Sequence, residues 1–420
     1  MSRIVVVGGA LAGIAAAARL ARAGHAVTLL EARDALGGRL AVPGVWSPVL
    51  PFPAPLRDLL RKSGRAFDRE FGTYGLRMVS APPVRHVFAD GTRFDWPTDR
   101  GEQWHLLNAR YSSAVATRWR ALVDTQDETW QALRGLGLEG ELVDRAQLAS
   151  RRRVLDPRRT VEDVARRLDH PHLADLVRDV ARFVGSEPRD TPAWLLSRLA
   201  VERTFGRWVL VDDAGTVHPA TAILDVLAGR LRTRGVRVLT GTPALRLRTG
   251  VVTTAAGEEH ADAIISTVNP WTHARLAGGG DLRRRHALAR LRPALAPTVS
   301  RTVTDEVAPA ALVEEVRHTP DGPIRTIRRA LPTGTEVIVH DFTRRTPTAG
   351  YGVRWQGPRT LLRLPPVRTP GQPRVFTASA ASRGGNEPWA QLLAGALAVY
   401  AAHETLTGEN IRPANRDYKP

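Results

Sequence analysis

The sequence predicts an α/β protein in which a Rossmann-type dinucleotide-binding domain is interleaved with an α+β substrate domain. The first observation is that residues 3–31 read as a strand, a glycine-rich turn, an alanine-rich helix and a second strand. This order is typical of a βαβ unit. The second is that residues 374–404 read as a strand, a glycine turn and a long helix. Both ends of the chain are therefore expected to share one domain.

The glycine-rich turn reads GGALAG at residues 8–13. In such a unit the first glycine permits the turn, the middle one lets the backbone approach a pyrophosphate, and the last lets helix pack on strand. The candidate cofactor contacts here are Gly8, Gly9, Ala10 and Gly13. Ala10 stands at the middle position, so its methyl group would meet the phosphate. Glu31 closes the second strand and is placed to accept hydrogen bonds from ribose hydroxyls.

The composition is that of a globular protein, with 420 residues of which 43% are hydrophobic and 24% charged. This length fits two or three domains, or one interleaved pair. No apolar run approaches the ~20 residues of a spanning helix, and the N-terminal run lacks the features of a signal peptide. We therefore expect a cytoplasmic protein. The absence of cysteine excludes disulfides, thiol nucleophiles and thiolate metal sites.

The formal net charge is +18, and of 60 basic residues only Lys62 and Lys419 are lysines. The arginines are spread along the whole chain, which favours a compositional bias over a dedicated patch, so no nucleic-acid partner is predicted. Runs such as RRR at 151–153 and 283–285 are interpreted as solvated faces. An anionic lipid surface is the alternative, and it would bring the protein into peripheral contact with a membrane.

The middle of the chain predicts helices followed by a β-rich block. Trp119 and Trp130 recur at helical spacing and are predicted to be core residues. Within the block at 296–365, the stretches VEEVRHTP, TEVIVHD and RTLLRLPP are predicted to be strands. The predicted helices cover residues 104–138, 160–185, 193–204 and 219–234.

Motifs for several other chemistries are missing from the sequence. It contains no GxSxG elbow, P-loop, HExxH or DDxxD motif. His170 and His172 are separated by a proline, and no third ligand accompanies them. We interpret them as helix-capping or surface histidines, and no metal site is predicted.

Four stretches, in this order, give the chain a family resemblance. They are the N-terminal unit ending in EARDALGGR, the pair RDLLRKSGRAFDRE and HVFADGTRFDWP, the stretch RFVGSEPRDTPAWLLSRLAVERTFGRW, and the closing GGNEPWAQLLAGALAVYAAHE. In these stretches the chain resembles the flavin-dependent amine oxidase superfamily and, within it, the phytoene desaturase branch. The resemblance implies an FAD cofactor and spans most of the chain.

The resemblance also implies which residues surround FAD. The diphosphate and adenosine would lie among Gly8, Gly13, Glu31, Gly38 and Arg39. The strand at Ala244 would place its backbone near adenine. The flavin ring and ribityl chain would lie against Gly384, Gly385 and Asn386.

Two departures from the family pattern fall at the cofactor. Ala10 replaces the middle glycine, and Ser379 stands where the family carries an aspartate that holds the ribityl or diphosphate region. The added methyl would cost about 1 kcal/mol, and the lost acceptor roughly 1–3 kcal/mol more. Because Glu31, GGR at 37–39 and GGN at 384–386 are all present, we expect FAD to be retained, with weakened binding, loss of the cofactor or compensating changes in this branch as the alternatives.

The order of these stretches predicts the domain organisation. The FAD-binding domain would be assembled from residues 1–45, 205–275 and 370–420, and the substrate domain from 46–204 and 276–369. The sequence does not indicate an oligomeric state.

Our main hypothesis is an FAD-dependent oxidoreductase that takes hydrogen from an apolar small molecule, with isoprenoids among the candidates. The alternatives are a non-redox isomerase or cyclase, in which Trp355 and Trp389 would stabilise a cation, and a non-catalytic binding protein. The candidate catalytic residues are Glu387 and Trp389, since NEPW sits at the turn expected to face the flavin. The other interpretation of Glu387 is a first-turn carboxylate that complements the helix dipole.

Overall fold

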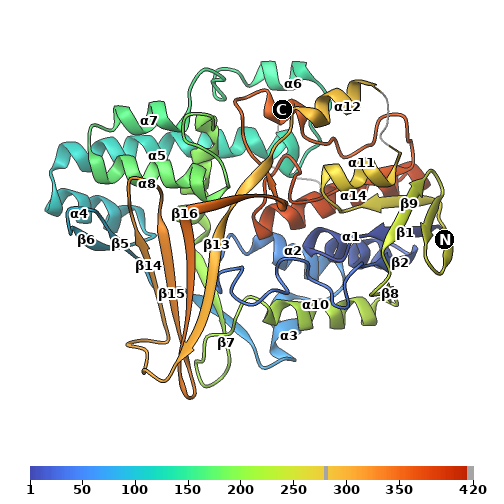
Figure 1. Cartoon of the computed structure of the whole chain (residues 1–420), viewed down its shortest axis with the longest axis horizontal. Coiled ribbons are helices and arrows are strands. Elements are labelled where there is room, and N and C mark those ends of the chain that lie inside the picture. The colour runs from blue at the N-terminus through green and yellow to red at the C-terminus, as the bar shows by residue number, and fades with distance from the viewer. Residues whose placement is uncertain (279–281, 414–420) are drawn as a thin grey trace.

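The centre of the structure is a five-stranded parallel sheet with the strand order β17-β12-β1-β2-β8. This computed structural model describes residues 1–278 and 282–413. Strands from the beginning, the middle and the end of the sequence lie side by side in this sheet (Figure 1). Their bounds are β1 Arg3–Val7, β2 Ala26–Leu30, β8 Arg237–Leu239, β12 Ala263–Ser266 and β17 Val375–Thr377.

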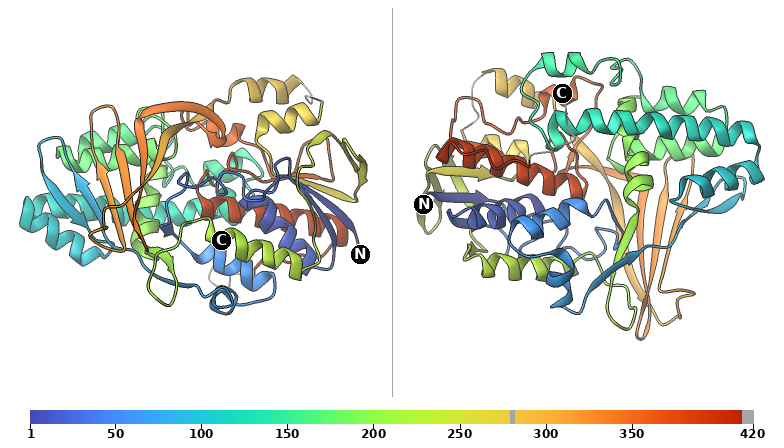
Figure 2. Two further views of the ribbon diagram at one scale, coloured as in Figure 1. Left: turned by 60° about the horizontal axis from the view of Figure 1, so that its bottom comes forward. Right: turned by 180° about the vertical axis from the view of Figure 1, so that it is seen from behind.

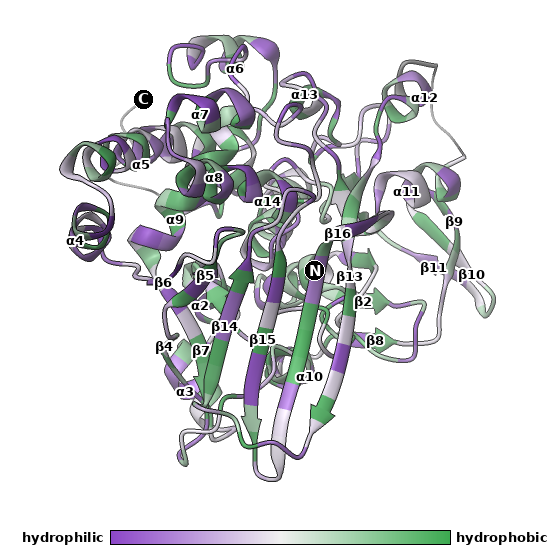
Figure 3. Ribbon diagram, turned by 60° about the vertical axis from the view of Figure 1, so that its left-hand side comes forward, coloured by the Kyte–Doolittle hydropathy of each residue, from purple (hydrophilic) through white to green (hydrophobic). Residues whose placement is uncertain are grey.

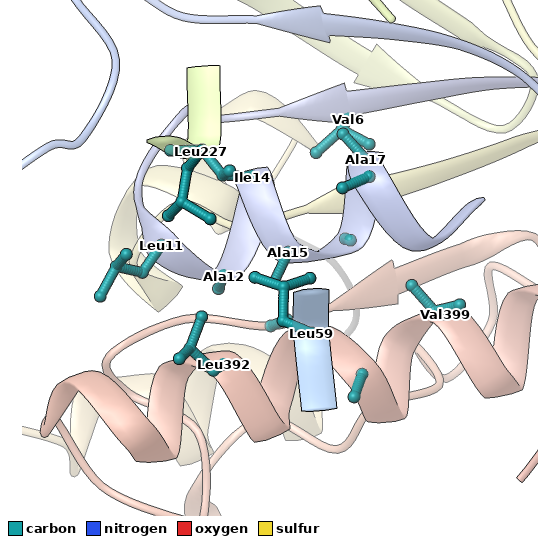
Figure 4. Close-up of a cluster of buried hydrophobic side chains, with 14 of the residues drawn as sticks. Val6, Leu11, Ala12, Ile14, Ala15, Ala17, Leu59, Leu227, Leu392 and Val399 are labelled. Atoms are coloured by element: carbon teal, nitrogen blue, oxygen red, sulfur yellow. The ribbon is translucent and has the colours of Figure 1, made fainter. Parts of the chain in front are cut away.

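Two helices from opposite ends of the chain pack against each other beside this sheet. They are α1 (Leu11–Arg22) and α14 (Pro388–Thr407), which lie side by side in both views of Figure 2. Ala12 and Ala15 of α1 face Leu392 of α14 in the hydrophobic core (Figure 4). The same core includes residues of α2 (Ala54–Lys62) and α10 (Ala222–Thr233). The small side chains of α1 let the two helices approach closely.

The second large element is a six-stranded sheet with the order β13-β16-β15-β14-β5-β6. Hydrophilic and hydrophobic residues follow one another along its long strands (Figure 3). In β14, buried and less buried residues alternate, which is expected of a strand with one face on a core. The bounds are β5 Val84–Val87, β6 Arg93–Trp96, β13 Pro293–Thr304, β14 Leu312–Arg317, β15 Ile324–Leu331 and β16 Gly334–Val353.

A group of helices packs near one edge of this sheet. A second hydrophobic cluster joins these helices to Phe88, which directly follows β5, and to Phe94 of β6. The helices are α4 Arg100–Arg110, α5 Ser113–Leu133, α7 Val161–Arg167, α8 Pro171–Phe183 and α9 Ser197–Phe205.

Shorter elements complete the described fold. A three-stranded sheet contains β3 Leu50–Pro51, β4 Arg77–Ser80 and β7 Arg207–Val211, and another contains β9 Ala244–Arg248, β10 Val251–Thr254 and β11 Gly257–His260. The short helices are α3 Phe67–Gly72, α6 Arg145–Ser150, α11 Pro270–Leu276, α12 Leu282–Ala289 and α13 Thr360–Arg363. A π-helical turn covers Arg134–Leu138, and a 3₁₀ turn covers Ala193–Leu196.

Two predictions of a single continuous helix are wrong, because each of these stretches forms two separate helices. The helix predicted over 104–138 is divided at Tyr111, after which Ser112 caps α5 by accepting a hydrogen bond from the Val115 N–H at 3.3 Å. The helix predicted over 160–185 is divided before Pro171, where Asp169 takes a positive φ of 49°. In both places a local capping or turn residue overrides the hydrophobic spacing.

The strand predicted for RTLLRLPP is also wrong, because Thr360–Arg363 form the short helix α13. The Thr360 hydroxyl accepts a hydrogen bond from the Gln356 N–H at 3.0 Å, and this contact tightens the turn that enters the helix. Two prolines follow, and they cannot donate to a strand ladder.

Several other predictions are confirmed. Trp119 and Trp130 are core residues, with 3% and 5% of their surfaces exposed. The arginine run at 151–153 lies exposed in a turn, whereas the side chains of Arg283 and Arg284 lie outside the described residues. Across 1–278 and 282–413, no helix is long and apolar enough to cross a membrane. The domain boundaries stay a prediction.

Because α1 and α14 approach closely, we expect a single methyl group added between them to lower the stability of the fold. In the substitution Gly395→Ala the new Cβ would lie 2.6 Å from the Ala12 carbonyl oxygen, a backbone atom that moves only with its helix. We expect the free energy of unfolding to fall by roughly 1–3 kcal/mol in urea titrations. Gly72→Ala is the control, because its Cβ meets no atom within 4 Å. Equal stability of the native chain and Gly395→Ala would contradict this packing.

Candidate functional site

The glycine turn after β1 leaves an open helix N-terminus. Gly8 has a φ of 103°, and a Cβ on Gly13 would lie only 1.9 Å from the Gly8 carbonyl oxygen, so both positions require glycine. Ala10 is the N-cap of α1 and provides no side-chain cap, and the first turn holds no acidic residue. Within residues 1–278 and 282–413, no side chain bonds the first N–H groups of α1, and such an open N-terminus favours an anion.

The Glu31 carboxylate lies directly beneath this turn. Oε2 accepts a hydrogen bond from the Gly9 N–H at 2.6 Å, and Oε1 accepts one from the Arg33 N–H at 2.9 Å. The Glu31 carbonyl accepts the Thr242 N–H at 2.8 Å, two residues before Ala244 begins β9. The structure thus brings Gly9, Glu31 and the start of β9 into one neighbourhood.

The segment after β2 folds back over the same turn. The Gly37 N–H donates to the Gly9 carbonyl at 2.8 Å. A Cβ on Gly38 would lie 2.9 Å from the Ala10 Cβ, so the Ala10 methyl already stands against this backbone. The extra methyl therefore narrows the space between the turn and Gly38.

Arg39 follows as a cation without an anionic partner. Among the residues that the structure describes, no carboxylate pairs with its guanidinium, which lies 4.6 Å from the centre of the Tyr351 ring. Burial lowers the pKa of Arg39. An arginine stays charged nonetheless, so an anion bound near Gly38 would meet an available guanidinium.

Ser379 follows β17, the edge strand at the opposite end of the sheet from β8, and it forms hydrogen bonds within its own loop. Its hydroxyl accepts a hydrogen bond from the Ala381 N–H at 3.1 Å, and its N–H donates to the Ser382 hydroxyl at 2.8 Å. Only 7% of its surface is exposed. Ser379 therefore stabilises the turn and presents no carboxylate.

Gly384 and Gly385 form the turn before α14, and an ion pair lies against them. Glu387, the N-cap of α14, is held by two nitrogens of Arg198. Nε donates to Oε1, and Nη2 donates to Oε2 at 3.1 Å. A Cβ on Gly385 would lie 2.6 Å from both the Arg198 and the Glu387 side chains. The Glu387 carboxylate is thus engaged by arginine and not by the helix N–H groups.

Trp389 is a core residue that borders the site. It is 4% exposed and makes edge contacts with Phe52 and Trp130, with ring centres 5.6 Å away in both cases. The Arg198 guanidinium lies 5.9 Å from its ring.

A cavity of about 320 Å³ extends from this turn between the six-stranded sheet and the helices. Its borders include Arg39, Asn386, Glu387 and Trp389. Much of the remaining lining is apolar and comes from α5, α8, α9 and the sheet, including Val123, Leu176, Val180, Phe183, Leu199, Val316 and Phe342. The cavity therefore joins the Arg39 end of the site to a largely hydrophobic space.

One wall of the cavity carries buried polar groups. Glu314 accepts hydrogen bonds from Arg207 and Arg325, and these two cations lower the pKa of Glu314 against the opposing effect of burial. The Tyr351 hydroxyl donates to the Phe183 carbonyl at 2.7 Å, and burial raises its pKa to about 12. His340 contacts the Gly44 carbonyl through Nε2 at 2.7 Å.

A buried histidine chain reaches the cavity from the sheet side. His86, in the cavity wall, contacts His318 at 2.8 Å, and His318 contacts Asp179 at 2.7 Å. Burial lowers the pKa of His86 well below its ordinary value. The two imidazole rings stack with centres 5.0 Å apart.

Four further residues border the cavity and were not predicted from the sequence: Arg198, Glu202, His86 and Tyr351. Arg198 and Glu202 lie four residues apart in the RLAVE segment, so a shared helix face could have been noticed. Nothing in the sequence connects Arg198 with Glu387, because 189 positions separate them. His170, by contrast, is the N-cap of α8, and His172 contacts Tyr111 at 2.6 Å and Asp90 at 3.0 Å.

The open N-terminus of α1, the cation at Arg39 and the adjoining cavity define a dinucleotide-binding protein of the two-domain α/β class. Comparison with known families identifies the family within this class. The family described as FAD dependent oxidoreductase matches residues 3–385, so the chain belongs to this family and FAD is its expected cofactor.

Curated relatives and solved structures agree with this assignment. The chain is 30% identical to hydroxyneurosporene desaturase of Cereibacter sphaeroides over 261 residues, which cover 58% of this chain and 50% of the relative. It is 27% identical to carotenoid 3,4-desaturase of Haloarcula japonica over 225 residues, which cover 50% of this chain and 44% of that relative. The chain thus spans about half the length of the curated relatives it matches.

Among solved structures, cyclohexylamine oxidase of Brevibacterium oxydans superposes with a TM-score of 0.61 at 14% identity, covering 96% of this chain and 99% of that one. A triple mutant of putrescine oxidase superposes with a TM-score of 0.62 at 14% identity, and the match covers 95% of this chain and 98% of that one. These likenesses confirm the predicted fold class.

His340 predicts an acid sensitivity of the folded state. Burial lowers its pKa to about 4, whereas an unfolded histidine titrates near 6.5. Between these values the unfolded chain binds a proton that the folded chain does not, so this contribution to stability is present above pH ~6.5 and is lost as the pH falls toward 4. In His340→Gln we expect the drop in unfolding free energy between these pH values to shrink by up to roughly 3 kcal/mol.

Urea unfolding at pH 7 and at pH 4.5 measures this difference. His105→Gln is the matched control, because His105 is exposed on α4. Equal acid sensitivity of the native chain, His340→Gln and His105→Gln would contradict the assignment.

Proposed function

We propose that this chain is an FAD-dependent oxidoreductase that removes hydrogen from an apolar small molecule of isoprenoid type. The observation that carries the proposal is the continuity of the site. A single cavity borders Arg39 and Asn386 at one end and is lined by aliphatic and aromatic side chains over much of its remaining surface.

The residues around the first turn fit the adenosine diphosphate part of FAD. The free N–H groups of α1 and the guanidinium of Arg39 would hold the diphosphate, with Gly8, Gly13 and Gly38 keeping the backbone close. Glu31 and the start of β9 at Ala244 would hold the adenosine. The present hydrogen bonds from Gly9 and Arg33 orient the Glu31 carboxylate while leaving it further acceptor capacity.

The turn before α14 would hold the flavin end. Gly384, Gly385 and Asn386 would border the ring and ribityl chain, and Arg198 fixes this turn through Glu387 and through the Gly384 carbonyl at 3.3 Å. When bound, flavin supplies an acceptor for hydride. We propose Glu387 and Trp389 as positioning residues of this wall. The Glu387 carboxylate is already bonded by Arg198, and Trp389 is packed in the core.

The protein itself would supply a dry and oriented pocket. The apolar lining favours a hydrocarbon body by the hydrophobic effect and keeps bulk water from the reacting bonds. The relatives hydroxyneurosporene desaturase and carotenoid 3,4-desaturase support an isoprenoid ligand.

We also propose contact with an anionic membrane surface, because the formal net charge of +18 favours anionic head groups. Sedimentation with anionic vesicles tests this contact, and absence of co-sedimentation at low salt would contradict it.

FAD binding tests the proposal most simply. The Ala10 methyl against Gly38 and the absence of a carboxylate at Ser379 both weaken the cofactor site. We therefore expect the double variant Ala10→Gly, Ser379→Asp to bind FAD roughly 10- to 100-fold more tightly than the native chain, measured by titration of flavin fluorescence. Arg39→Met should bind FAD more weakly.

Arg93→Met is the control for Arg39→Met, because Arg93 is exposed on β6 and its loss should leave FAD binding unchanged. A native chain that purifies without flavin, together with a double variant that also ignores added FAD, would contradict the proposal. That result would favour the non-redox isomerase or cyclase alternative.

A further inference from the structure

Among the described residues, three carboxylates line the cavity, and they differ in how they are satisfied. Glu314 is bonded by Arg207 and Arg325, and Glu387 is held by two nitrogens of Arg198. Glu202 has neither a hydrogen bond nor an ion pair to its side chain within residues 1–278 and 282–413. It is therefore the one lining carboxylate whose oxygens are both available.

Glu202 projects into the cavity from α9. It lies four residues after Arg198, about 6 Å along the helix axis and on the same face. Glu202 is exposed and lies in the cavity lining, and protein atoms nonetheless surround its carboxylate. Burial raises its pKa, although Arg207 opposes the shift.

The neighbouring cation on α9 does not satisfy Glu202. Arg203 instead bonds Asp124 at 2.8 Å and Asp127 on α5. Both acceptor oxygens of Glu202 are therefore left for a ligand in the cavity. A ligand that brought a hydrogen-bond donor to Glu202 would gain a hydrogen bond to a charged group, which is stronger than one between neutral groups.

The charges around the cavity restrict that donor. Four of the five arginines in the described lining are already paired: Arg198 with Glu387, Arg207 and Arg325 with Glu314, and Arg203 with Asp124 and Asp127. Arg207 and Arg325 also act electrostatically on Glu202, so they disfavour a cationic amine beside it, whereas a neutral hydroxyl is not repelled. The lining arginines are Arg39, Arg198, Arg203, Arg207 and Arg325.

We propose that Glu202 accepts a hydrogen bond from a hydroxyl group of the substrate. The ligand of this cavity is accordingly an apolar molecule that carries a hydroxyl, and not a pure hydrocarbon. This inference rests on the proposed function, which supplies the apolar body of the ligand. Glu202 acts as a specificity determinant, because it distinguishes ligands by one polar group.

Binding of two matched probes tests this inference without any need for flavin. Geranylgeraniol and its methyl ether share the same hydrocarbon body, but only the alcohol can donate a hydrogen bond. Quenching of tryptophan fluorescence reports binding, because Trp46, Trp96, Trp119 and Trp389 line the cavity. We expect the native chain to bind the alcohol about five- to tenfold more tightly than the ether.

Variants assign the preference to Glu202. Glu202→Met keeps the length of the side chain but removes the acceptor, so the alcohol and the ether should bind equally. Glu202→Gln retains an acceptor oxygen and should keep part of the preference. Glu128→Met is the control, because Glu128 is exposed on α5 and its loss should change neither affinity.

The outcomes separate this inference from the proposed function. If the native chain binds both probes equally, or if Glu202→Met keeps the full preference, the assignment of Glu202 is overturned while the apolar pocket stands. Tighter binding of geranylgeranylamine than of the alcohol at pH 7 would also overturn it, in favour of a cationic ligand. If neither alcohol nor ether binds, the apolar substrate of the proposed function fails as well.

Discussion

The structure depends on the pairing of β1 with β12 in the middle of the parallel sheet. Val7 pairs with Ser266, and the Thr267 hydroxyl that follows donates to the Gly8 carbonyl at 2.7 Å. This register fixes the glycine turn at the carboxyl end of the sheet. β17 continues the same sheet beside β12, so the turn before α14 reaches the same region from the far end of the sequence.

Burial of charge is the second constraint on the site. Arg198, Arg207 and Arg325 are each tied to a carboxylate, which keeps the polar wall of the cavity compatible with its apolar side. Arg39 and Glu202 are the exceptions, one cationic and one acidic. Neither group has a side-chain ion pair within the described residues, and we propose that Arg39 meets an anionic ligand and that Glu202 meets a hydrogen-bond donor.

Local patterns predicted the fold, but they did not predict the whole site. The βαβ unit and the C-terminal strand-turn-helix are continuous stretches, so their residues signal their structure directly. Ser112 and Pro171 broke predicted helices because a cap or a proline outweighs hydrophobic spacing. The partnership of Arg198 with Glu387 is formed only by tertiary packing, since no periodicity links positions so far apart.

The central claim is that one continuous site holds a flavin at the Arg39 end and an apolar molecule in the cavity beyond it. A crystal structure of the chain grown with FAD tests it most directly. The account predicts the diphosphate between the N-terminus of α1 and Arg39, with the ring bordered by Asn386 and facing the cavity. An FAD bound elsewhere, or a ring directed away from the cavity, would contradict it.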